Sequence, residues 1–165
     1  MKKTLLTLLL ALVIIPATGI SLVSCSDDAA TESALPQISK KEARAELKKR
    51  GIKKKQYDDE LFSAAFKGNC DLVQLLIIAG ADVNKRHVFS SEEYSTSYTP
   101  LSIAICSGSS SPSAKRMVVK NLLAAPDINP NVMVDVGDDT KTVLEFAEMH
   151  GMTEIADMLR AAGAE

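Results

Sequence analysis

The apolar positions of the chain recur in three eight-residue segments with one layout. Each segment begins with Leu, has Ala in fourth place and ends with Gly, and the copies span residues 61–68, 101–108 and 144–151. A second apolar stretch follows each copy, with apolar residues at i, i+3 and i+4, over residues 72–84, 117–129 and 155–164. This spacing is typical of one face of an α-helix. The pattern therefore predicts three units, each with a helix, a Gly turn, a second helix and a loop.

Two stretches of this pattern resemble a known repeat. The sequences TPLSIAI at residues 99–105 and LLIIAGADVN at residues 75–84 are similar to the ankyrin repeat, in which T-P-L-H-x-A is followed by V-x-L-L-L-x-x-G-A-D-V-N. The resemblance covers residues 58–165. It implies an all-α fold, an ankyrin-repeat solenoid of about three helix-turn-helix repeats with extended hairpin loops and an N-terminal capping helix. It also implies that Thr99 caps a helix with Pro100 at its first position, and that Asp82 and Asn84 shape the turn into a hairpin.

The chain departs from the family pattern in spacing and at several positions. The Gly residues that end the three segments are 40 and 43 residues apart, whereas the family period is about 33. We place the excess in residues 86–97, in a lengthened inter-helix turn at residues 109–113, and in residues 130–139. The usual His after T-P-L is replaced by Ser102 and Glu145, and Val143 stands in place of Pro. Atypical first and last repeats are expected, because both ends of a stack face water.

A charged segment precedes the first repeat. Ser39 and Glu42 form an S-x-x-E capping box, which predicts a helix that ends at Gly51. Residues 42–52 resemble a segment that precedes the first repeat in bacterial ankyrin-like proteins, and there Leu47 and Ile52 would cover that repeat. Residues 40–55 hold nine basic and two acidic side chains. They would either attract anionic lipid head groups or form the solvated face of a terminal helix.

The first residues are typical of a bacterial lipoprotein precursor. Lys2 and Lys3 precede an apolar run over residues 5–15, and the sequence LVSC at residues 22–25 resembles a lipobox. The resemblance implies lipid attachment, including palmitate, at Cys25. Ser26 favours the outer membrane of the bacterial cell envelope, facing the periplasm. An uncleaved signal anchor and an ordinary secretion signal are the alternatives. The predicted organisation is a signal peptide at 1–24, a flexible tether at 25–38, the capping helix at 39–57 and the repeat domain at 58–165.

Composition and motifs argue against an enzyme. The net charge is −2, which disfavours a nucleic-acid binder. His87 and His150 lack metal-ligand spacing, and the sequence contains no C-x-x-C, G-x-S-x-G or phosphate-binding loop. We interpret the GDD sequence at 137–139 as a solvated loop, and predict no catalytic residue, metal, cofactor or small-molecule substrate. Cys70 and Cys106 would either pair in an oxidising compartment or remain two small apolar residues.

The family resemblance implies a protein partner at the concave face of the repeats, formed by first helices and hairpin tips. Aromatic and Arg side chains are common interface anchors, and the first hairpin and first helix supply the candidates Phe66, Lys67, Arg86, His87, Phe89, Tyr94 and Tyr98. The alternative is that Phe89 and the two Tyr residues pack the hairpin against the stack. The predicted function is a membrane-tethered interaction module. The alternatives are an inhibitor or immunity-type protein that blocks one envelope or secreted enzyme, and a catalytic lipoprotein.

Overall fold

Helices account for most of the residues described by the computed structural model, which are 37–90, 95–108, 110–136 and 139–165. The signal peptide and Cys25 lie outside them. In chain order the elements are α1 (Lys40–Lys49), η1 (Lys54–Gln56), α2 (Tyr57–Lys67), α3 (Cys70–Ala79), β1 (His87–Ser90), β2 (Ser95–Tyr98), α4 (Pro100–Cys106), α5 (Pro112–Leu123), β3 (Met133–Val136), β4 (Asp139–Thr142), α6 (Val143–Met149) and α7 (Thr153–Ala161).

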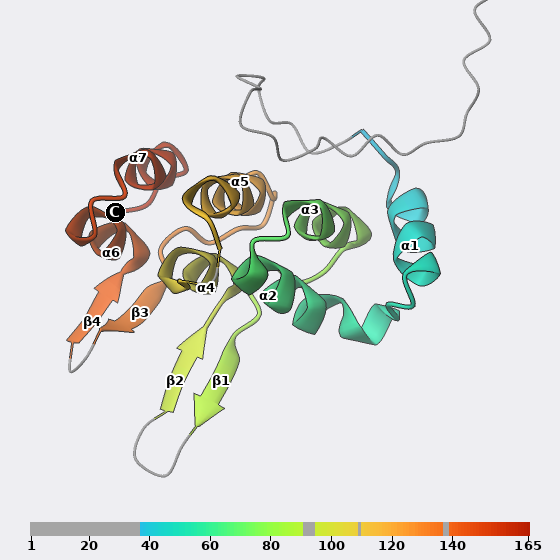
Figure 1. The fold of residues 1–165 in the computed structure, drawn as a ribbon, viewed down its shortest axis with the longest axis horizontal. Coiled ribbons are helices and arrows are strands. Elements are labelled where there is room, and N and C mark those ends of the chain that lie inside the picture. The colour runs from blue at the N-terminus through green and yellow to red at the C-terminus, as the bar shows by residue number, and fades with distance from the viewer. Residues whose placement is uncertain (1–36, 91–94, 109, 137–138) are drawn as a thin grey trace, which may run out of the picture.

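Three helix-turn-helix pairs lie side by side in two rows. The first helices α2, α4 and α6 form one row, and the second helices α3, α5 and α7 form the other (Figure 1). Each helix contacts its partner within the pair and the equivalent helix of the next pair. This arrangement confirms the three predicted helical repeats.

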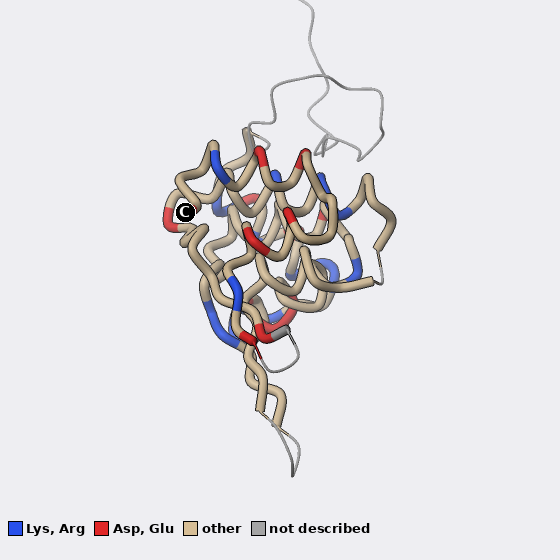
Figure 2. Tube along the Cα trace, turned by 90° about the vertical axis from the view of Figure 1, so that its left-hand side faces the viewer, with Lys and Arg blue, Asp and Glu red and all other residues tan. Residues whose placement is uncertain are grey.

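The loops between the pairs are two-stranded antiparallel sheets, so the description all-α needs a correction. β1 pairs with β2, with His87 opposite Tyr98, and β3 pairs with β4, with Met133 opposite Thr142. Both hairpins project from the row of first helices (Figure 1), and the first extends well beyond the stack (Figure 2). They form where the spacing between repeats exceeds the family period, because the added residues pair with one another.

Leu and Ala in the repeated segments face the core for different reasons. Leu61, Leu101 and Leu144 are at most 8% exposed and fill space between the helices. The Ala at the fourth position of each segment is also buried, where a small side chain lets neighbouring helices approach closely. The buried residues form one continuous core from residue 43 to residue 164.

Capping boxes begin the first helices of the second and third repeats, α4 and α6. The Thr99 hydroxyl accepts from the Ser102 amide at 3.2 Å, and the Ser102 hydroxyl accepts from the Thr99 amide at 2.9 Å. Thr142 and Glu145 make the same reciprocal bonds at 3.1 and 2.8 Å. Two of the amides left unpaired at each helix start are thereby satisfied.

The inter-helix turn of the second repeat is shorter than predicted at residues 109–113. Helix α5 begins at Pro112, because the Ser111 hydroxyl accepts from the Ala114 amide at 3.2 Å and Pro suits the first helical position. The added residues therefore lengthen a helix as well as a turn.

The predicted N-terminal helix packs against the first repeat. Ala43 and Leu47 of α1 are fully buried, and α1 contacts α3. Arg44 adds a hydrogen bond from its Nε to the Ala79 carbonyl at 3.0 Å. The helix ends as predicted at Gly51, whose φ of +78° permits the Ile52 amide to reach the Leu47 carbonyl at 2.9 Å.

Asn84 links the end of the first repeat to the end of the second. Its Oδ1 accepts from the Asn129 amide at 2.9 Å, and its Nδ2 donates to the Asp127 carbonyl. Asp82 holds Asn84 by accepting from its amide at 2.9 Å. The predicted turn roles of Asp82 and Asn84 are therefore confirmed, and Asn84 in addition joins neighbouring repeats.

Across the described residues, every helix is too short or too polar to traverse a lipid bilayer.

Candidate interaction surface

Four ring side chains gather where the first hairpin meets the first helix. We call Phe62, His87, Phe89 and Tyr98 the aromatic cluster. The Phe62 and His87 rings stack with centroids 4.2 Å apart, and Phe62 lies 5.7 Å from Phe89. Phe89 in turn lies 6.2 Å from Tyr98 across the β1–β2 pair. Such offset and tilted arrangements are favourable for aromatic rings, so the cluster fixes the base of the hairpin against α2.

Ion pairs hold the same junction from the other side. Lys85 lies 3.0 Å from a carboxylate oxygen of Asp59 and 3.6 Å from one of Asp58, at the start of α2. The hydrogen bond to Asp59 raises the pKa of Lys85 and outweighs the opposing effect of burial. These contacts orient the hairpin so that its first strand lies beside the face of α2 that carries Phe62.

Part of this junction stays open to solvent. Phe89 is 50% exposed, Val88 on the same strand is 65% exposed, and Phe66, one turn after Phe62 on α2, is 41% exposed. Three of the five exposed large hydrophobic side chains in the described part of the chain thus come from two neighbouring elements. The packing interpretation of Phe89 and Tyr98 accounts for their mutual contacts, and the half of Phe89 left in water remains available to a partner.

His87 is the least well satisfied member of the cluster. Its Nε2 atom is buried and has no hydrogen-bond partner among the described residues. Burial lowers the pKa of His87, and the nearby positive charge of Lys85 lowers it further. A proton on the ring is therefore disfavoured beside Phe62 and Lys85, and the carboxylates of Asp59 and Asp58 oppose this shift only in part.

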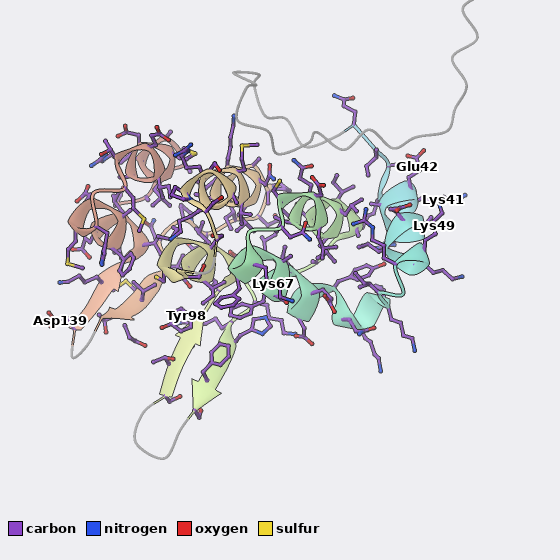
Figure 3. The ribbon with its side chains drawn as sticks, viewed as in Figure 1. Lys41, Glu42, Lys49, Lys67, Tyr98 and Asp139 are labelled. Atoms are coloured by element: carbon purple, nitrogen blue, oxygen red, sulfur yellow. The ribbon has the colours of Figure 1, made fainter. Side chains whose placement is uncertain are left out.

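The remaining candidates lie around this junction. Arg86 donates to the Ser97 hydroxyl at 3.1 and 2.7 Å, which braces the hairpin across its strands. Lys67 is exposed at the last residue of α2 (Figure 3), and Tyr94 lies outside the described residues. The structure thus brings His87, Phe89 and Tyr98 together. Sequence reasoning missed Phe62, which contacts both His87 and Phe89. Its place beside Leu61 on the first helix was the sign that could have found it.

The chemistry-bearing side chains are dispersed. Within the residues described, no group of three or more His, Cys, Asp and Glu residues is placed to hold a metal ion. His150 stacks on Phe146 with centroids 4.1 Å apart, far along the chain from His87. Of the GDD sequence, only Asp139 is described.

The two cysteines of the repeats are not paired with each other. Cys70 is buried at the first position of α3, as expected for a core residue. Cys106, the last residue of α4, is a free thiol. Burial raises its pKa to about 11, with Lys115 partly opposing the shift. Such a thiol is a poor nucleophile at neutral pH.

Stacked helix pairs with projecting hairpins and an exposed apolar junction define a helical-repeat interaction module. Residues 61–165 match the family described as ankyrin repeats (3 copies), which is more than half of the chain. The chain therefore belongs to the ankyrin-repeat family. Ankyrin repeats are generic protein–protein interaction modules and are typically non-catalytic. No curated protein matches the chain.

Proposed function

We propose that the chain is a membrane-tethered protein–protein interaction module of the bacterial cell envelope. The observation that carries this proposal is the exposed apolar surface of Phe66 and Phe89 where the first hairpin meets α2, held in place by the aromatic cluster. Rigidly held aromatic side chains bind partners at low cost in conformational entropy. A partner protein would seat on the first helices and the hairpin tips, and Phe89 would be the central contact.

The tether rests on the sequence of the first 25 residues. The apolar run that ends in LVSC supports cleavage before Cys25 and lipid attachment to its sulfur. More than one acyl chain gives stable anchoring, because each buried CH₂ contributes about 0.8 kcal/mol. Residues 26–38 would then span the distance from the bilayer to α1. The proposed location is the outer membrane, with the repeats in the periplasm.

The role proposed for α1 follows from its packing. A solenoid exposes an apolar face at each end unless it is covered by an element whose outer face is polar. Ala43 and Leu47 are buried, whereas Lys41, Ala45 and Lys49 on the opposite side of α1 are exposed. We infer that α1 is the N-terminal cap of the stack.

Site-specific photo-crosslinking tests the proposed contact in the intact protein. A photoreactive phenylalanine analogue replaces Phe89 in one variant and exposed Ala161 of α7, in the opposite row of helices, in a control. The full chain is expressed with its leader in a bacterial host, irradiated in intact cells and purified. We expect one abundant adduct from position 89 and none from position 161, together with an acylated Cys25 in the mass spectrum.

The outcomes separate the components of the proposal. Equal adducts at both positions, or none at 89, would contradict the proposed binding surface. An unmodified Cys25 would contradict the lipid tether and leave the contact result intact. If the crosslinked partner is an enzyme whose activity falls when the purified chain is added, the inhibitor alternative is the correct description.

A further inference from the structure

Positive charge is concentrated at one end of the molecule. Residues 40–55, which we call the basic segment, carry nine basic and two acidic side chains, a net charge of +7 in a chain whose overall net charge is −2. All nine basic residues are exposed. In contrast, acidic residues are scattered over the repeats (Figure 2), and Lys41 and Lys49 lie on α1 at the far end of the stack (Figure 3). The fold therefore separates a strongly positive end from a negative body.

The carboxylates of the basic segment neutralise few of its cations. Glu46 pairs with Lys49 at 3.3 Å and with Arg50 at 3.4 Å, whereas Glu42 is occupied by the Ser39 amide and hydroxyl in the capping box. Within the described part of the chain, six lysines of the segment form no ion pair, namely Lys40, Lys41, Lys48, Lys53, Lys54 and Lys55.

Four of the cations surround a cleft between α1 and η1. The cleft has a volume of about 500 Å³, and its charged lining consists of Arg44, Lys48, Lys53 and Lys54, with no carboxylate. Ile52 and Tyr57 supply apolar surface between them. The position of Arg44 is fixed, because its Nε donates to the Ala79 carbonyl at 3.0 Å. The surface that these residues give the cleft is mainly apolar, from their side-chain stems. Four cations that share the border of one cleft repel one another, and an anion bound there would relieve that repulsion.

We propose that this cleft binds the phosphate group of an anionic membrane lipid. Lysine ammonium groups bind phosphate as point charges, and the guanidinium of Arg44 adds fixed donors. The choice of a lipid rests on the proposed membrane tether, which joins α1 at residue 38 and so brings the basic segment next to the bilayer. Anionic lipid surfaces attract basic side chains by about a factor of five for each Lys close to the surface. The bound head group would hold the positive end of the stack toward the membrane.

Vesicle binding tests this inference without the lipid anchor. A chain of residues 26–165 lacks Cys25 but keeps every residue of the core, which lies entirely between residues 38 and 164, so it is expected to fold. Its partition onto vesicles containing phosphatidylglycerol is measured by sedimentation and compared with pure phosphatidylcholine vesicles. Two triple variants carry equal charge changes: Lys48→Gln, Lys53→Gln and Lys54→Gln in the cleft, and Lys41→Gln, Lys49→Gln and Lys55→Gln outside it.

The cleft variant should lose at least about tenfold more of its partition coefficient than the control variant. Each variant removes three positive charges, so the general attraction to an anionic surface falls equally in both. The additional loss in the cleft variant therefore measures binding in the cleft itself. Equal losses would overturn the cleft as a site, and equal binding of the wild-type chain to both kinds of vesicle would overturn anion recognition. Inorganic pyrophosphate serves as the soluble probe in calorimetry. Binding of pyrophosphate without any binding to anionic vesicles would overturn the lipid as its source. Unchanged thermal unfolding of both variants excludes misfolding as the cause.

Discussion

Gln74 of α3 donates from Nε2 to Oδ1 of Asn121 on α5 at 3.2 Å, and both side chains are almost fully buried. This amide pair joins the second helices of neighbouring repeats. The other two amide atoms, Gln74 Oε1 and Asn121 Nδ2, have no partner among the described residues. The amide pair thus makes only one of its two possible hydrogen bonds. It therefore contributes less to the stability of the fold than an apolar pair at the same place would.

Removing one member of this amide pair should be worse than removing both. Asn121→Leu alone leaves the Gln74 amide buried without a partner, and we expect a loss of about 1–3 kcal/mol in the free energy of unfolding. Gln74→Leu alone should cost a similar amount. The double variant should be close to wild type or more stable, because two apolar side chains pack together and leave no buried polar group without a hydrogen bond. Urea unfolding of the four proteins gives the coupling energy, and additive losses would contradict this account.

Buried leucines at the N-terminal helix and inside the first repeat should contribute similarly to stability. Leu47 on α1 and Leu76 on α3 are both fully buried. Each change to Ala should lower the free energy of unfolding by about 2–5 kcal/mol, since it removes apolar contacts and leaves a cavity. If Leu47→Ala costs less than about 1 kcal/mol in urea unfolding, α1 is not coupled to the stack and its role as a cap is wrong.

Local signals were sufficient to predict the repeats. Leu and Ala at fixed places, Gly at helix ends and caps such as Thr99 act within one turn of a helix, so they can be recognised without knowledge of the fold. They placed the helix pairs correctly. They also identified Ser39 as a helix cap, and its side chain accepts from the Glu42 amide at 3.2 Å.

Contacts between distant residues could not be predicted in this way. Phe62 and His87 are 25 residues apart in the sequence, and Gln74 and Asn121 are 47 apart. Neither pair belongs to a periodic pattern. The first pair depends on how the hairpin packs against α2, and the second depends on how the first repeat packs against the second repeat. The hairpins themselves were predicted, but the fold class all-α left out their strands, for a related reason. Their sequences are short and their pairing is set by the helices that precede and follow them.

The junction at the first hairpin should weaken when the solution is acidified. Because burial, aided by Lys85, lowers the pKa of His87 in the folded state, the unfolded chain with its ordinary pKa near 6.5 takes up a proton first. The stability that depends on neutral His87 is therefore present above pH 6.5 and is lost as the pH falls through the lowered value. We expect the free energy of unfolding to decrease between pH 7.5 and pH 5.5.

A His87→Gln variant provides the control for this pH dependence. Glutamine is not titratable, so the variant should be less sensitive to pH over the same interval. The carboxylates of Glu42, Glu46 and Glu145, whose pKa values are also lowered, change their protonation below this window. Urea unfolding at both pH values measures the difference. An equal pH dependence in wild type and variant would show that His87 is not the responsible group.

Cys106 should react slowly with alkylating reagents until the solution is strongly alkaline. Burial raises its pKa from the ordinary 9.0 to about 11. At pH 8 the reactive thiolate is therefore about a hundredfold scarcer than in an unfolded chain. Iodoacetamide labelling is followed by mass spectrometry of the peptide that contains Cys106, and the same peptide in denaturant is the reference. The folded rate should be about a hundredfold lower at pH 8 and should keep rising with pH beyond 9. A folded rate that stops rising near pH 9 would instead indicate that limited access alone slows the reaction, and the raised pKa would be wrong.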